Sequence, residues 1–381
     1  MIESSEKKST RNAHRMLMAS GAFYLLIAFE FFYMASPFAA YFYTVYGPGL
    51  DSLQAWGLSG WMLWFFLPHI VAETKSALIN FIPLLGLLLF VGGLFGFAVG
   101  AFQVYRAKIR KSGAVTVGLY RYIRHPQYTA LIVASIGMLL IWPRFLVLYS
   151  TIAMVFAYVS LARVEERICA KTYANYDKYR SGTGGFFPRL VGNFRGRRLS
   201  VRLPRLISFL ASIALIVVAA TMIALGLRQH AIASLYTVKD EQGIYLSVTR
   251  LSDQELSEIA AIARAHQKTD EALKTLQEGD RFIAYVLPTQ MYVSEIPMRL
   301  PDGQEFGHSV PKDRDLARYK VVYTRAEFSS GGLLETENIL HNALNKHALV
   351  EVHVNLRSEV VESISPPPEQ SFYPDIQVPV F

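Results

Sequence analysis

The 381-residue chain has almost no cysteine and little charge. Cys169 is its one cysteine, which excludes an intrachain disulfide and a zinc site built from several cysteines. Charged residues make up 18% of the chain and hydrophobic residues 52%. Soluble domains average about 25% charged residues, so this chain is too apolar for an ordinary soluble protein. We expect an integral membrane protein long enough to hold two structural units.

Acidic residues are scarce in the first 227 positions. This part has 8 Asp/Glu against 23 Lys/Arg, whereas residues 228–381 have 22 Asp/Glu against 15 Lys/Arg. The charges of the two parts, +15 and −7, add up to the net charge of +8. Basic residues in short loops between apolar segments are typical of membrane topology and of contact with anionic headgroups. We therefore expect a lipid bilayer, and no nucleic acid, as the partner of this chain.

Long apolar runs predict an all-α polytopic bundle of about five transmembrane helices. These runs span residues 16–45, 77–102, 127–142, 144–162 and 207–227. The third and fourth meet at Trp142-Pro143-Arg144, where a proline beside a charge marks the tip of a tight helical hairpin. Glycines in the second run permit close helix contacts; they are Gly86, Gly92, Gly93, Gly96 and Gly100. Glu30 lies inside the first run, so we expect it to face a partner, a water-filled cavity or the bundle interior.

The segment 54–71 is apolar but unlike the other runs. It contains three of the four tryptophans together with Pro68. Because tryptophan prefers the headgroup level of a bilayer, we expect a re-entrant or interfacial element, with a full crossing as the alternative. His69, next to Pro68, is expected to be interfacial.

Basic loops predict the orientation of the chain. Residues 103–125 hold six Lys/Arg and no acid, and residues 163–205 hold eleven against three acids. Both should face the cytoplasm. Five crossings then place the N-terminal tail, residues 1–15, inside and the acidic region after 228 outside. We expect a multi-pass protein of a bacterial cytoplasmic membrane, with its transmembrane domain at 16–227.

The sequence pattern of residues 228–365 predicts a small extramembrane α+β domain, which a proline-rich tail follows at 366–381. Strand patterns occupy 243–249, 281–287, 318–324 and 349–355, and helical patterns 253–266 and 335–347. The histidines of this region, including His341, His347 and His353, lack tight ligand spacing, so the sequence predicts no metal site. Nothing in this region indicates a protein partner.

Two polar clusters flank the predicted hairpin. The first, residues 118–128, combines cationic, imidazole and phenolic groups: Tyr120, Tyr122, Arg124, His125, Pro126 and Tyr128. The second follows the next apolar run and contains Glu165, Glu166, Tyr176, Tyr179 and the run Phe186-Phe187-Pro188. Proline at a first helical turn would fix the bend that aims His125 inward.

This order of motifs resembles the isoprenylcysteine carboxyl methyltransferase and phospholipid methyltransferase superfamily of integral membrane enzymes. The shared features are an Arg-His-Pro-x-Tyr box, a helical hairpin, a Glu-Glu pair and a tail of aromatics that ends in proline. In this chain they fall between about residues 80 and 190. Ala130 and Ala174 stand where the family usually has glycine. The resemblance implies a methyltransferase that takes S-adenosylmethionine as cofactor and a lipid-like or amphiphilic acceptor.

The motif residues offer what this cofactor needs. A zwitterion with a sulfonium and an adenine requires an anion for the ammonium, a cation for the carboxylate and aromatic faces for the rest. On this interpretation Arg124 and His125 hold the carboxylate, and Glu165 or Glu166 holds the ammonium or the ribose. Five tyrosines form the walls; they are Tyr120, Tyr122, Tyr128, Tyr176 and Tyr179. Arg124, His125 and Glu166 are the candidate catalytic residues.

Two alternatives remain open. Some membrane sterol and enone reductases resemble the same box and use NADPH, although the Glu-Glu pair favours a methyltransferase. The other alternative is a non-catalytic membrane scaffold or sensor with a degenerate pocket, in which residues 228–365 carry the function.

Overall fold

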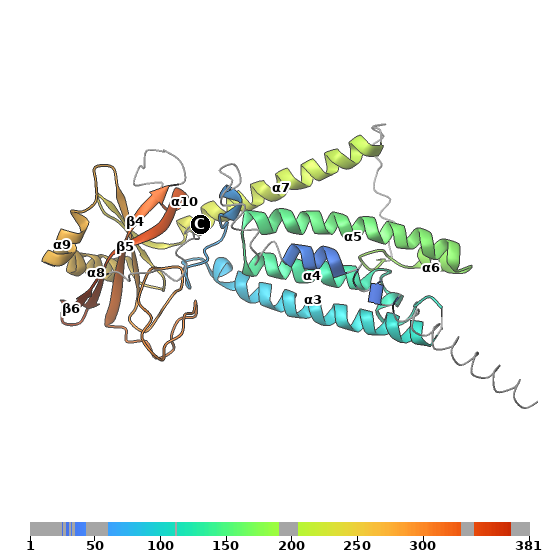
Figure 1. The fold of residues 1–381 in the computed structure, drawn as a ribbon, viewed down its shortest axis with the longest axis horizontal. Coiled ribbons are helices and arrows are strands. Elements are labelled where there is room, and N and C mark those ends of the chain that lie inside the picture. Colours follow the sequence, from blue (N-terminus) through green and yellow to red (C-terminus); the bar gives the residue numbers. More distant parts are fainter. Residues whose placement is uncertain are drawn as a thin grey trace, which may run out of the picture. The chain divides into compact units, whose positions relative to one another are not determined.

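The computed structural model of the chain describes residues 35–42, 60–110, 113–189, 205–328 and 339–366, with four single positions between 25 and 32 (Figure 1). The tail at 1–15, Glu30 and residues 367–381 lie outside this part. The chain divides into two compact units, each discontinuous in sequence. The first unit takes 1–46, 87–138 and 150–202, and the second takes 47–86, 139–149 and 203–381. The domain boundaries expected from composition remain a prediction.

In the part of the chain that the structure describes, three helices are long and apolar enough to cross a membrane. They are α3 (Ala77–Ile109), α5 (Phe145–Thr172) and most of α7 (Arg205–Ala233). The hairpin partner of α5, α4 (Pro126–Ile141), is apolar but has 16 residues, fewer than the roughly 20 that span a bilayer. Of the first apolar run, residues 35–42 are described and helical. The described part therefore contains helices able to span a membrane, as predicted, whereas the count of five crossings is not confirmed.

The predicted hairpin tip is confirmed at Trp142-Pro143-Arg144, where the Arg144 amide donates to the Trp142 carbonyl over 2.8 Å. In the same unit, η1 (Gly60–Leu63) precedes an irregular stretch that runs against this tip. Phe65 pairs with Arg144 in an isolated bridge, and the Phe66 amide donates to the Pro143 carbonyl over 2.9 Å. Residues 60–71 form no long helix, which favours the interfacial or re-entrant interpretation over a full crossing.

Glycines on α3 let α4 approach closely, and α3, α4 and α5 lie side by side (Figure 1). A Cβ at Gly93 would lie 2.5 Å from the Ala134 nitrogen, and one at Gly100 would lie 2.9 Å from Cγ of Gln127. Ala130 replaces the usual glycine of the motif. A Cβ added at Gly96 would lie 3.4 Å from the Cβ of Ala130, which is an ordinary van der Waals contact. A Cβ added at Gly92 would have no atom within 4 Å. The predicted glycine contact is thus found at Gly93 and Gly100 but not at Gly92.

This difference predicts opposite outcomes for two neighbouring substitutions. Gly93→Val must push backbone atoms of α4 away, so we expect a loss of about 1–3 kcal/mol, the range for overpacking. Gly92→Val adds the same side chain in open space and should change stability by less than about 0.5 kcal/mol. Thermal unfolding of both variants in detergent checks this. Equal melting temperatures would contradict the close α3–α4 contact.

The second unit contains a six-stranded sheet whose order follows the sequence. Its strands are β1 (Tyr236–Lys239), β2 (Gly243–Ser247), β3 (Arg281–Pro288), β4 (Arg318–Phe328), β5 (Ala343–Asn355) and β6 (Val360–Ser365). Only the β2–β3 pair is parallel. A parallel pair needs a long crossover, and here α8 (Asp253–Ala265) and α9 (Gln267–Leu273) supply it. The buried residues Leu256 and Ile259 of α8 pack with Tyr245 and Tyr323 of the sheet.

The α+β prediction for this region is confirmed in type, with one error. The four predicted strands are present, and β1 and β6 were not predicted. The helix predicted at 335–347 is wrong over most of its described part, because only α10 (Ile339–Asn342) is helical and β5 begins at Ala343. Ala343 and His347 pair with Phe328 and Arg325 of β4. Pairing with an existing strand overrides the local helical pattern, since strand formation depends strongly on cross-strand context.

Candidate functional site

The Arg-His-Pro box forms the turn between η2 (Gly118–Arg121) and α4 in the first unit. Pro126 is the first residue of α4, where the absent N–H is not needed for the helix. The amides of Arg124 and His125 donate to the carbonyls of Gly184 and Gly185 over 2.8 and 3.2 Å. The turn is therefore held by its backbone against the segment that leads to Pro188.

Glu166 is the centre of the polar cluster. Arg124 Nε donates to its Oε1 over 2.8 Å, and His125 Nε2 lies 3.1 Å from the same oxygen. Arg180 Nε lies 3.5 Å from Oε2. The side chains of Glu166, Arg124 and His125 are 15%, 14% and 5% exposed. Two cations and an imidazole thus compensate one largely buried carboxylate, which fixes its position.

Glu165, one residue earlier on α5, is more accessible. Its side chain is 42% exposed, and its Oε2 lies 3.6 Å from His125 Nδ1. The Tyr128 hydroxyl donates to its Oε1. Tyr128 is itself buried and stacks on Tyr158 at 5.0 Å between ring centroids. His125 therefore stands between the two glutamates, and Glu165 is the carboxylate that a ligand can reach more easily.

The aromatic residues of the two clusters also converge. The Tyr179 hydroxyl, from α6 (Tyr176–Gly182), donates to the Tyr120 carbonyl over 2.6 Å. The Tyr176 and Tyr179 rings lie 5.8 Å apart. Burial raises the pKa of Tyr120, Tyr176 and Tyr179 above the usual range, so all three phenols stay protonated at neutral pH. Tyr122 is the exception among the predicted wall residues, because its side chain is 61% exposed.

Arg124 differs from the expectation that it holds a ligand carboxylate directly. Besides Glu166, its guanidinium donates through Nη1 to the Thr183 carbonyl and, over 3.1 Å, to the Arg180 carbonyl. Arg124 thus ties Glu166 to the end of α6. Arg180, whose side chain is 52% exposed, is the more accessible cation. Arg180 was not predicted as a site residue, although its position one turn after Tyr176 on the same helix was a usable signal.

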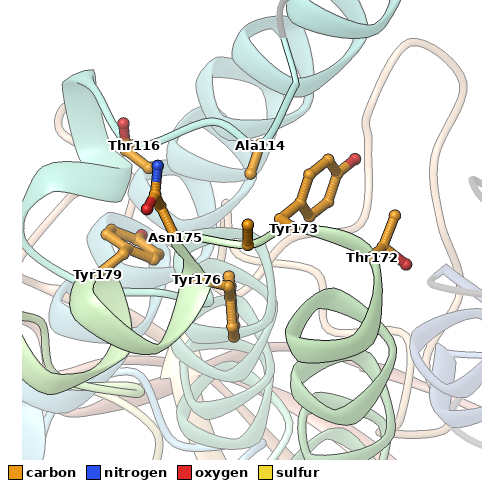
Figure 2. Close-up of a pocket in the computed structure, with 8 residues that line it drawn as sticks. Ala114, Thr116, Thr172, Tyr173, Asn175, Tyr176 and Tyr179 are labelled. Atoms are coloured by element: carbon orange, nitrogen blue, oxygen red, sulfur yellow. The ribbon is translucent and has the colours of Figure 1, made fainter.

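A pocket of about 350 Å³ opens beside the tyrosines (Figure 2). The loop after α3 and the corner between α5 and α6 contribute its lining, which consists of Ala114, Thr116, Thr172, Tyr173, Ala174, Asn175, Tyr176 and Tyr179. Its volume lies at the lower end of the range for small-molecule sites. Tyr176 and Tyr179 belong to both the pocket and the polar cluster. The loop residues were not predicted, because nothing in their sequence sets them apart from an ordinary connection.

Comparison with known proteins agrees with the motif. Residues 83–176 match the family model described as phospholipid methyltransferase. This match covers about a quarter of the chain and includes the Arg-His-Pro box and both glutamates, while residues 229–381 lie outside it. No curated protein and no solved structure matches the chain. The predicted resemblance is confirmed, and it indicates a membrane methyltransferase in general terms.

Proposed function

We propose that this chain transfers a methyl group from S-adenosylmethionine to a lipid-like or amphiphilic acceptor. The observation that carries the proposal is the cluster around Glu166 and His125, which lies beside an aromatic pocket inside the segment similar to phospholipid methyltransferases. The acceptor class includes phospholipid amines and isoprenylcysteine carboxylates, and the polytopic fold suits a substrate that arrives from the bilayer.

The residues present fit the chemistry of this cofactor. Glu165 offers a reachable anion for the ammonium, and Arg180 offers a reachable cation for the carboxylate. The pocket beside Tyr176 and Tyr179 offers aromatic faces for the adenine. Glu166 and His125 stay at the centre of the cofactor site, and Arg124 acts as a positioning residue that holds Glu166 in place.

Methyl transfer asks mainly for alignment. S-adenosylmethionine supplies an activated methyl group, and holding acceptor and donor in line contributes several kcal/mol without any metal. A carboxylate acceptor is already a nucleophile, whereas a protonated amine must first lose a proton. For the amine, the Glu165 carboxylate, 42% exposed and next to His125, is a reachable base among the described residues of the cluster.

The same geometry argues against the reductase alternative. NADPH carries several phosphate charges, and an exposed carboxylate such as Glu165 would repel them. The decayed-pocket alternative is also weakened, because Glu166, Arg124 and His125 are fully engaged with one another and Ala130 is accommodated by Gly96.

Calorimetric titration of the detergent-purified protein tests this function. We expect S-adenosylmethionine and its demethylated product to bind saturably, because the cluster offers one partner for each end of the zwitterion. NADPH should show no saturable binding. Saturable NADPH binding without a response to either sulfur compound would contradict the methyltransferase proposal and favour the reductase.

The proposal also includes an orientation, with the cofactor site at the cytoplasmic face and residues 228–365 outside. The basic loops at 103–125 and 163–205 support it through the positive-inside rule. In a bacterial host, protease added to spheroplasts should therefore digest the region beyond α7. If that region resists digestion while a reporter fused to its end is active in the cytoplasm, the orientation is reversed.

A further inference from the structure

Three side chains with metal-binding atoms meet in the second unit, outside the segment that matches the methyltransferase family. His69 Nε2 lies 2.9 Å from Oε1 of Glu295, and His308 Nε2 lies 3.2 Å from the same oxygen. One ligand atom from each residue falls within 4.8 Å of the others. Among the described residues, these are the ones that form such a group.

Two separate segments deliver these side chains. His69 follows Pro68 in the irregular stretch after η1, while Glu295 and His308 belong to the long connection between β3 and β4. In that connection the Gly307 amide donates to the Tyr292 carbonyl over 2.8 Å. This bond folds the connection back on itself, which brings His308 to Glu295. The cluster therefore results from backbone structure rather than from chance side-chain contact at a surface.

The distances suit a small divalent ion. Zinc binds histidine nitrogen and carboxylate oxygen at about 2.0–2.2 Å in a tetrahedron, which puts ligand atoms roughly 3.3–3.5 Å apart. The two separations of 2.9 and 3.2 Å need to widen by only a few tenths of an ångström. Two imidazoles and one carboxylate are also a donor set that zinc prefers.

Surrounding residues hold the ligands as the outer shell of a metal site does. The His69 ring stacks on Phe65 at 4.7 Å and meets the edge of Trp142 at 4.3 Å. The Ser294 hydroxyl donates to Glu295 Oε2 over 2.8 Å. The side chains of Glu295 and His69 are 6% and 10% exposed, whereas His308 is 39% exposed. The cluster is therefore closed on two sides and open to solvent at His308.

We propose that His69, Glu295 and His308 bind one zinc ion, with a fourth position open to solvent. The ion would cross-link the stretch after η1 to the β3–β4 connection. Arg144, whose buried guanidinium interacts electrostatically with Glu295, adds positive charge nearby. An anionic fourth ligand such as hydroxide would offset that charge. No metal site was predicted from the sequence, because metal-binding residues are recognised there by tight spacing along the chain. These ligands are instead spread over more than 200 positions.

Zinc titration of the tag-free, full-length protein, stripped with chelator, tests the proposal. We expect about one zinc per chain and a melting temperature that rises with zinc concentration. His308→Ala removes a half-exposed ligand and should weaken zinc binding at least tenfold, since even outer-shell substitutions cost about 10- to 100-fold. Glu295→Gln keeps the size of the buried side chain and should weaken binding as strongly.

His347→Ala is the matched control. His347 also pairs with a glutamate, Glu327, at 3.1 Å, but its side chain is 55% exposed and, among the described residues, no third ligand joins the pair. This variant should bind zinc within about twofold of the parent. The proposal is overturned if the parent protein binds no zinc saturably, or if His308→Ala and Glu295→Gln bind it as the parent does.

Discussion

Replacing Arg124 by alanine is expected to destabilise the first unit by about 1.5–3 kcal/mol, the range for a hydrogen bond to a charged group, because its ion pair with Glu166 is partly buried. The variant would leave Glu166, 15% exposed, without its closest cation and would release two carbonyls at the end of α6. S-adenosylmethionine binding should fall with it, because Glu166 and Arg180 would lose their fixed positions. Thermal unfolding and calorimetry on the same detergent preparation measure both effects.

Arg121→Ala provides the control for this substitution. Arg121 lies three residues earlier in the same motif, but its side chain is exposed. Exposed charges contribute little to stability, so we expect its melting temperature and cofactor affinity to stay close to those of the parent. Arg124→Lys should behave like the alanine variant, because an ammonium cannot reproduce the forked set of three hydrogen bonds. If Arg124→Ala and Arg121→Ala were equally mild, the positioning role of Arg124 would be wrong.

Glu166→Gln is expected to weaken S-adenosylmethionine binding about tenfold to a hundredfold. The substitution keeps the size of the side chain but removes the charge that holds His125 and Arg180 in place around the cofactor site. A loss of about 1.5–3 kcal/mol, the range for a charged hydrogen bond, corresponds to this change in affinity. His125→Ala should weaken binding comparably. Calorimetric titration of each variant gives the affinity directly.

Asp177→Asn is the matched control for charge. It makes the same change from carboxylate to amide on α6, beside Tyr176, but its side chain is exposed. Its affinity should stay within about twofold of the parent. The site assignment is untenable if Glu165→Gln, Glu166→Gln and His125→Ala all bind S-adenosylmethionine like the parent protein.

The parts of the fold that follow from local rules were predictable from the sequence. Apolar length located α3, α5 and α7, and Pro143 located the hairpin tip, because both signals act within one element. The segment at 343–347 could not be read in this way, since its pairing with β4 decides its structure. Strands β1 and β6 are short, with four and six residues, and their identity likewise depends on a neighbour.

In the candidate site, too, residue types at a family spacing were predictable from the sequence, whereas contacts between distant segments were not. The sequence pointed to His125, Glu165 and Glu166, because residue types at a family spacing limit the chemistry they can perform. It did not reveal that Arg124 would be engaged by Glu166 and α6, or that Arg180 would be the reachable cation. The group of His69, Glu295 and His308 could not be predicted from the sequence, because contacts between distant segments leave no local pattern.

The location of the cofactor tests the account most directly. Ultraviolet cross-linking of methyl-labelled S-adenosylmethionine to the purified protein, followed by peptide mapping, reports which residues lie against the bound molecule. We expect label in peptides from residues 114–128 or 165–180, displaced by excess S-adenosylhomocysteine and reduced in Glu166→Gln. Label confined to residues 228–365, or label that excess S-adenosylhomocysteine does not displace, would contradict a cofactor site beside Glu166.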